Sequence, residues 1–201
     1  IGTLDGIGKS YVAKHFLKFL KDFPDISLKV FLEQPESLLS KYKKQMLQAL
    51  ILPEHLIPGS MEKHELFDEY LCFVVHPDLL RGENLSEIEF SQIKKIPFIF
   101  FEDHDPNFSQ WARSKYKQVP RGLKPRLTFN SFTPIIHAVK EGLGAAVIPS
   151  HILERPYFVE QTKNLVVSRE VFLGKICFAY SAELSDDLKT KQLLEHLKSS
   201  N

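Results

Sequence analysis

The stretch Ala138-Val139-Lys140-Glu141-Gly142-Leu143-Gly144-Ala145-Ala146-Val147-Ile148-Pro149 decides the fold class of this chain. Just before it, Thr133 and Pro134 are predicted to begin a helix, because a hydroxyl can cap the first turn and proline fits the first helical position. Gly142 ends that helix. Residues 145–148 form a short buried strand, which the final proline stops. A helix that leads directly into a buried strand is typical of an α/β protein.

The same alternation continues on both sides of this stretch. Periodicity predicts strands at residues 96–101 and 126–129, with a helix at residues 106–116 between them. An apolar ribbon follows at residues 175–181, and a closing helix runs from Ser185 to about Lys198. Strands therefore keep alternating with helices through the second half of the chain.

Residues 85–90 predict one more helix start. Ser86 can cap the helix and Glu89 can close a capping box, while Leu85 and Phe90 can form the hydrophobic staple. The signal is structural and implies no chemistry.

The first half of the chain predicts a parallel sheet. The expected elements are the end of a strand at residues 1–4, a helix at 9–22, a strand at 26–32, a helix at 37–45 and a strand at 47–52. Alternating strands and helices favour right-handed crossovers and the doubly wound arrangement. The apolar ribbon at residues 70–75, together with that at 175–181, indicates two α/β lobes joined by two crossings.

The helix at residues 9–22 is more apolar than a single core requires. It carries two stripes of apolar side chains: Ala13, Leu17 and Leu20 on one, and Val12, Phe16, Phe19 and Phe23 on the other. A dimer partner or a second packing contact within the chain would bury the excess.

Composition limits the classes of function. Twenty-six basic and 25 acidic residues give a net charge of +1, so the chain lacks the basic surplus of a domain that grips DNA. The longest apolar runs are far shorter than the roughly 20 residues of a membrane helix. We therefore expect a cytoplasmic protein without membrane contact.

Cys72 and Cys177 stand in apolar, strand-like surroundings and are expected to be buried thiols.

The segment Asp5-Gly6-Ile7-Gly8-Lys9-Ser10 follows a strand, precedes a helix and is similar to the phosphate-binding loop of thymidylate kinases. The pattern also needs a glycine at position 3, where this chain has Thr3. A P-loop nucleotide kinase acting through Gly6–Ser10 is thus one alternative. The simpler interpretation is a tight turn whose first helical N–H groups offer a site for an anion.

Other chemistry finds little support in the sequence. The histidines never form HExxH, and Ser60 lacks the flanking glycines of a nucleophile elbow. The cluster Glu102-Asp103-His104-Asp105 contains metal-ligand types, but adjacent residues in a loop rarely converge on one ion. We expect no enzymatic activity, catalytic residue, cofactor or metal site.

Three blocks together resemble the effector-binding domain of LysR-type transcription regulators. They are residues 16–28, residues 66–77 and, most specifically, the stretch at residues 138–149 with its helix, double-glycine turn, strand and proline. The blocks occur in the family's order and span nearly the whole chain. Gln45 and Gln48 depart from the family, which usually has glycine and aspartate there.

The resemblance implies two lobes of the periplasmic-binding-protein type II kind, residues 1–74 with 181–201 and residues 75–180, that close on a small-molecule effector. It further implies a homodimer, leaves open a tetramer of the intact protein, and assigns DNA binding to an N-terminal domain outside these residues. A periplasmic-type solute-binding protein shares this architecture and is the other alternative.

By position, the resemblance places three segments at the effector cleft. They are Leu4, Asp5, Gly6, Ile7 and Gly8 at the first helix start, Phe101, Glu102 and Asp103 after a second-lobe strand, and Asn130, Ser131, Phe132 and Thr133 at the next helix start. Two helix N-termini facing one cleft favour an anionic effector. The carboxylates of Asp5, Glu102 and Asp103 oppose this, so the effector's chemistry stays open.

Overall fold

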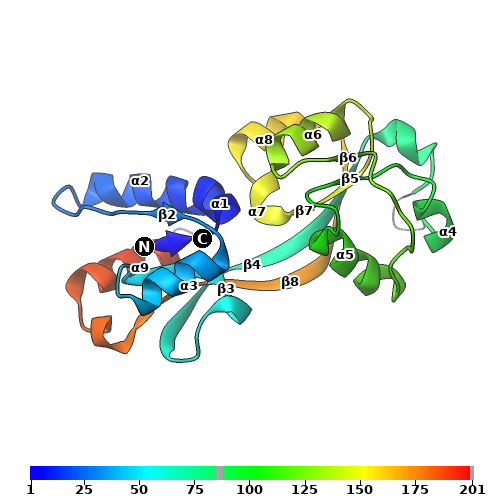
Figure 1. Cartoon of the computed structure of the whole chain (residues 1–201). Coiled ribbons are helices and arrows are strands. Elements are labelled where there is room, and N and C mark those ends of the chain that lie inside the picture. Colours follow the sequence, from blue (N-terminus) through cyan, green and yellow to red (C-terminus); the bar gives the residue numbers. More distant parts are fainter. Residues whose placement is uncertain (85–87, 200–201) are drawn as a thin grey trace. The chain divides into compact units, whose positions relative to one another are not determined.

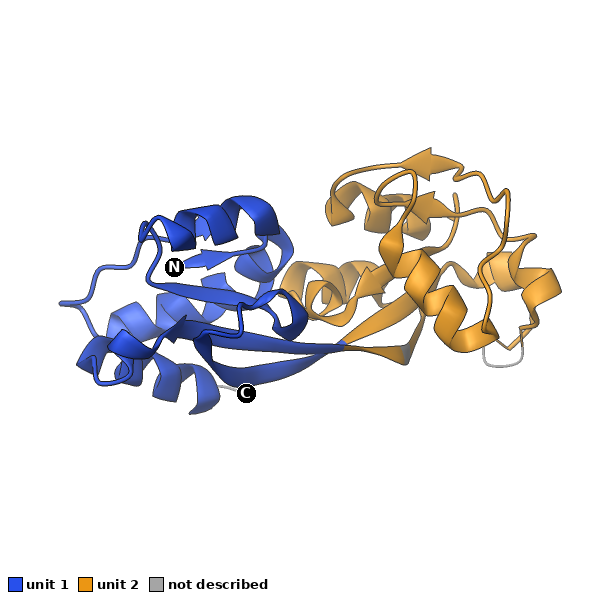
Figure 2. Cartoon of the chain, turned by 60° about the horizontal axis from the view of Figure 1, so that its bottom comes forward, with its two compact units in different colours: residues 1–69, 174–201 blue, residues 70–173 orange. Residues whose placement is uncertain are grey.

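The computed structural model describes residues 1–84 and 88–199. The chain divides into two compact units, Ile1–Glu69 with Gly174–Asn201 and Tyr70–Leu173 (Figure 2). Two long strands, β4 (Met61–Val75) and β8 (Val166–Ser181), run through the boundaries between these units (Figure 1). The lobe boundaries predicted after residues 74 and 180 fall near the ends of the same two strands.

The first unit is built on a parallel set of strands. Its central strand β1 (Gly2–Thr3) pairs in parallel with β2 (Phe31–Leu32) on one side and β3 (Ala49–Pro53) on the other. The antiparallel strand β8 continues the sheet beyond β3, with Ala49 opposite Tyr180. The remaining elements of this unit are α1 (Asp5–Ile7), η1 (Gly8–Val12), α2 (Ala13–Asp22), α3 (Pro35–Lys43), η2 (Glu54–Leu56), η5 (Ala182–Leu184) and α9 (Leu188–Ser199).

One face of α2 fills the core of this unit. Phe16 and Phe19 are buried there together with Leu193 and Leu197 of α9. Leu17, in contrast, is 65% exposed, and Ala13 is exposed as well. The phenylalanine stripe is therefore satisfied within the chain, whereas of the other stripe only Leu20 packs, partly buried, against this core.

The second unit is also α/β. Strands β5 (Ile99–Phe100) and β6 (Leu127–Thr128) are parallel, Phe98 bridges in parallel to Ala145, and β7 (Ala146–Pro149) runs antiparallel to β4. Aromatic rings dominate its core: Phe73 stacks on Trp111 with ring centroids 4.7 Å apart. Its helical elements are η3 (Pro77–Leu80), α4 (Phe90–Ile93), α5 (Pro106–Tyr116), α6 (Phe132–Lys140), α7 (Ser150–Leu153) and α8 (Pro156–Thr162).

Mixed α/β architecture is thus confirmed, but several element bounds differ from the prediction. The strand predicted at residues 26–32 is reduced to Phe31–Leu32, because β1 offers only Gly2 and Thr3 as parallel partners. The helix expected at residues 37–45 starts two residues earlier, at Pro35, and α8 was not predicted.

Two predicted helix starts are shifted. Leu85 and Ser86 lie outside the described residues, and α4 has its capping box one turn later, where Glu89 is the N-cap and Gln92 its partner. The next shift concerns α6, which begins at Phe132 after Ser131 rather than after Thr133. In both cases a polar residue two or three positions from the predicted cap takes the capping position.

Candidate functional site

The first predicted segment, Leu4–Gly8, opens a continuous helical run. Leu4 is extended, with φ −71° and ψ 150°, and its carbonyl accepts the first helical hydrogen bond from the N–H of Gly8 at 2.8 Å. Asp5 is exposed, Leu4 and Gly6 are partly exposed, and Ile7 and Gly8 are buried. The N–H groups of the first turn are therefore the part of this segment that can meet a ligand.

The side chains that follow are already engaged within the helix. Lys9 Nζ lies 2.9 Å from Asp5 Oδ1, and the Ser10 hydroxyl donates to the Gly6 carbonyl at 2.8 Å. A P-loop needs an open loop at these residues, with the lysine free for phosphate and the serine free for magnesium. Because residues 5–12 are helical here, the geometry argues against the P-loop kinase alternative.

The second predicted segment, Phe101–Asp103, follows the end of β5. It is held by Asp105, which was not among the predicted site residues. Asp105 is buried, and its Oδ2 accepts from the Phe101 N–H at 2.8 Å. Its Oδ1 accepts from the N–H groups of Asn107 and Phe108 and so caps α5. Glu102 and Asp103 are exposed.

Two opposing effects act on the Asp105 carboxyl. Burial raises its pKa, while the three backbone N–H groups favour its charged form, and the balance lies above the ordinary value. The signal for its role was an aspartate directly before Pro106, since Asp at the N-cap and Pro at the first helical position form a common helix start. Asp105 is thus the anchor of this segment.

The third predicted segment, Asn130–Thr133, forms the start of α6. Ser131 is the N-cap, yet its hydroxyl makes no capping hydrogen bond. Asn130, Ser131 and Thr133 are exposed, and the ring of Phe132 lies 4.8 Å from that of Phe101. The second and third segments therefore meet within the second unit through an aromatic contact. No group of three or more metal-ligating side chains occurs in the described part of the chain.

Comparisons with known proteins identify the family of this chain. The family model of the LysR substrate binding domain matches residues 1–201. The chain belongs to this family. Its members are regulatory ligand-binding domains of transcription factors.

Solved structures of LysR-type regulators share the fold. The sulfate-bound mutant OxyR2 regulatory domain from Vibrio vulnificus is 18% identical, with a TM-score of 0.74 over 98% of this chain and 93% of that one. The CrgA regulatory domain from Neisseria meningitidis is 13% identical, with a TM-score of 0.73 over 99% and 96%.

Against a longer CrgA structure the LysR domain described here covers 66% of that chain, with 14% identity and a TM-score of 0.75. No curated protein matches the sequence. Among the described residues, no helix combines the length and the apolar character needed to cross a bilayer.

Proposed function

We propose that this LysR domain senses a small-molecule effector between two lobes and passes the signal to DNA binding through a homodimer. Membership of the family carries the proposal. An effector that binds one arrangement of the lobes more tightly raises the population of that arrangement, and this changes the geometry of the dimer. DNA binding itself belongs to an N-terminal domain outside these residues, and we place the protein in the cytoplasm.

The effector site is proposed at the three segments described above. Leu4–Gly8 and Asn130–Thr133 each supply helix N–H groups, which favour negative charge. Asp5, the acidic residue nearest the first helix start, is paired with Lys9, which reduces its repulsion of an anion. We therefore favour a small anion such as a carboxylate, and the sulfate-bound OxyR2 relative makes an inorganic oxyanion a natural second probe.

The homodimer is proposed to use the exposed face of α2 and the sheet edge beside it. Leu17 and Ala13 lie on that face, and Val30 and Leu32 near the edge strand β2 are exposed. A second copy that covers this surface would bury the apolar stripe that the monomer leaves in water.

Thermal unfolding against a panel of small carboxylates, amino acids, aromatic acids and sulfate tests the proposed effector site. A ligand at 100 times its dissociation constant stabilises the folded state by about 2.7 kcal/mol, and each kcal/mol raises the midpoint by about 2 to 4 °C at this size. We expect one class of anion to raise the midpoint, and magnesium-ATP to leave it unchanged.

Variants then locate the site. Ser131→Ala and Thr133→Val should weaken binding of the effector found in the panel without changing the midpoint of the free protein, because both side chains are exposed. Ser60→Ala, an exposed serine of the first unit, is the matched control. Unchanged affinity in both α6 variants would remove Asn130–Thr133 from the site.

A further inference from the structure

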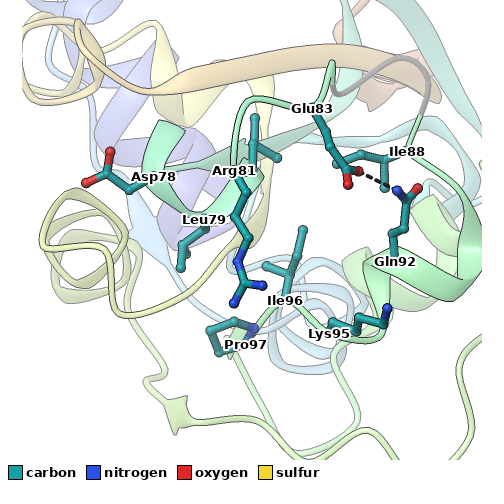
Figure 3. Close-up of a pocket in the computed structure, with 10 residues that line it drawn as sticks. Asp78, Leu79, Arg81, Glu83, Ile88, Gln92, Lys95, Ile96 and Pro97 are labelled. Carbon is teal, nitrogen blue, oxygen red and sulfur yellow. Dashed lines mark hydrogen bonds between the residues drawn. The ribbon is translucent and has the colours of Figure 1, made fainter.

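The second unit holds a pocket of about 320 Å³ that contains none of the residues proposed for the effector site. It lies between η3, the start of α4 and the residues that lead into β5 (Figure 3). Its volume is at the lower end of the range of small-molecule sites. A ligand of the size of a single substituted ring would fit it.

The floor of this pocket is apolar. Leu80, Ile88 and Ile96 line it and belong to the aromatic core of the unit, where each is buried. Because these side chains are fixed by the core, an apolar group placed on them would lose water without ordering a mobile surface.

Two cations, Arg81 and Lys95, line the pocket. Within residues 1–84 and 88–199, neither Arg81 nor Lys95 makes an ion pair or a side-chain hydrogen bond. Arg81 stands in the left-handed region at φ 53°, next to Gly82 at φ 85°. That conformation is uncommon for a residue with a side chain. Figure 3 shows the guanidinium directed toward Ile96 and Pro97.

The two acidic residues of the lining, Asp78 and Glu83, each have another partner close by. Glu83 accepts a hydrogen bond from the Gln92 amide, and the two face each other across one end of the pocket (Figure 3). Asp78 points away from the other side chains, and its carboxylate lies 3.5 Å from His76 Nδ1. Among the described lining residues, Asp78 balances one of the two cations in number but points away, so the side chains that face the pocket, Arg81, Lys95 and Glu83, carry one positive charge more than negative.

From these features we infer that the pocket is a second ligand site, which takes a small monocarboxylate with an apolar body. The carboxylate would bind Arg81 and Lys95, and the apolar body would cover Leu80, Ile88 and Ile96. A single surplus charge favours a monoanion over inorganic phosphate, because Glu83 repels added negative charge.

Backbone amide chemical shifts of the 201-residue chain, titrated with benzoate, test the inference. We expect saturable shifts at residues 79–83 and 92–97 with a dissociation constant in the millimolar range. Benzyl alcohol, which keeps the ring and lacks the charge, should bind at least about tenfold more weakly, since charge-assisted hydrogen bonds are the stronger kind. Inorganic phosphate should give no saturable shift there.

Arg81→Asn and Lys95→Gln should each weaken benzoate binding about tenfold. Asparagine tolerates the left-handed region, so the loop keeps its conformation. Lys117→Asn is the matched control, because Lys117 is also an exposed cation with positive φ, here 59°, and lies outside the pocket.

Equal losses of benzoate affinity in Lys117→Asn and Arg81→Asn, or no saturable shift with benzoate at residues 79–83 and 92–97, would overturn the second site. Stronger binding of phosphate than of benzoate would overturn its ligand class. The inference is independent of the proposed effector site, because Ser131→Ala should leave these shifts unchanged while altering binding at α6.

Discussion

A Cβ added to Gly144 would lie 2.8 Å from the carbonyl oxygen of Pro97. The two backbones approach this closely because the N–H of Ala145 donates to the same carbonyl at 2.8 Å and Phe98 bridges to Ala145. Gly142, two residues earlier, has a different reason to be glycine: its φ is 68°, and the nearest atom to an added Cβ is 3.8 Å away on His76.

We therefore predict that asparagine restores stability relative to alanine at Gly142 but not at Gly144. Gly142→Ala should lower the free energy of unfolding by about 1 to 2 kcal/mol, and Gly142→Asn by clearly less, because asparagine tolerates the left-handed region. Gly144→Ala should cost about 1 to 3 kcal/mol by overpacking, and Gly144→Asn at least as much, because space and not φ is limiting. Urea unfolding measures all four variants. Recovery of stability in Gly144→Asn would contradict the steric argument.

His15 should make stability depend on pH. It is 5% exposed, and its ring lies tilted against that of Tyr11 with centroids 4.1 Å apart. Burial first, and then the nearby Lys14, lowers its pKa from 6.5 to about 4. Between these values the unfolded state binds more protons than the folded state, so the free energy of unfolding falls as pH drops from 6.5 toward 4. The loss from this group is at most about 3 kcal/mol.

The slope of the unfolding free energy against pH is the measurement. His15→Gln should flatten it between pH 6.5 and 4, whatever the variant's own stability. His55→Gln, at an exposed histidine of the same unit, should leave the slope as it is. A slope that survives in His15→Gln would assign the pH dependence to other groups.

The two cysteines should not act as a peroxide sensor. Cys72 and Cys177 are both buried, and burial raises the pKa of both thiols, that of Cys72 to about 11. At neutral pH about one Cys72 thiol in ten thousand is then a thiolate, the form that reacts. Peroxide treatment of the folded chain should leave two free thiols on later denaturation. Loss of both thiols together with two hydrogens of mass would show a disulfide and contradict this prediction.

Asp105 should couple the stability of α5 to effector binding. Asp105→Ala removes an N-cap and leaves the buried Phe108 N–H unpaired, at a cost of about 1 to 3 kcal/mol. It also frees Phe101, which lies in the proposed effector site. Asp187→Ala removes the carboxylate that caps α9 by accepting from the Thr190 N–H, and should cost about 1 kcal/mol and leave effector affinity unchanged. Calorimetric titration of both variants decides whether Asp105 acts through Phe101.

Sequence patterns predicted the elements that are long or sharply bounded. The run from α6 through the double glycine to β7 could be predicted because Gly142, Gly144 and Pro149 each impose a local backbone requirement. The extent of the strand predicted at residues 26–32 could not be predicted in this way. Its sequence alternates as a strand does, but its length depends on pairing with β1, which is distant in the sequence. Gln45 adopts φ 57°, in the left-handed region that favours glycine, and nothing local in the sequence marks it.

The candidate site remains a prediction from positions along the chain, and the sequence did not indicate which contacts hold these residues in place. Helix starts and strand ends along the sequence indicate where ligands bind in α/β folds, and this placed Phe101 and Ser131. The contact between Phe101 and Phe132 and the anchoring of Phe101 by Asp105 join residues 4 to 31 positions apart. The Asp105-Pro106 pair marks the helix cap locally, but the second bond of Asp105 to Phe101 and the contact of Phe101 with Phe132 depend on how the loop and α6 pack.

Leu17 should control the homodimer. It is 65% exposed on α2, whereas Leu188 on α9 is 68% exposed and lies outside the proposed dimer surface. Burying a leucine is worth about 1.5 to 3 kcal/mol, and a symmetric dimer buries two copies. Leu17→Glu should therefore raise the dimer dissociation constant about a hundredfold or more in sedimentation equilibrium. Leu188→Glu adds the same charge at an equally exposed leucine and should leave the dimer intact. Dissociation by Leu188→Glu alone would move the interface from α2 to α9.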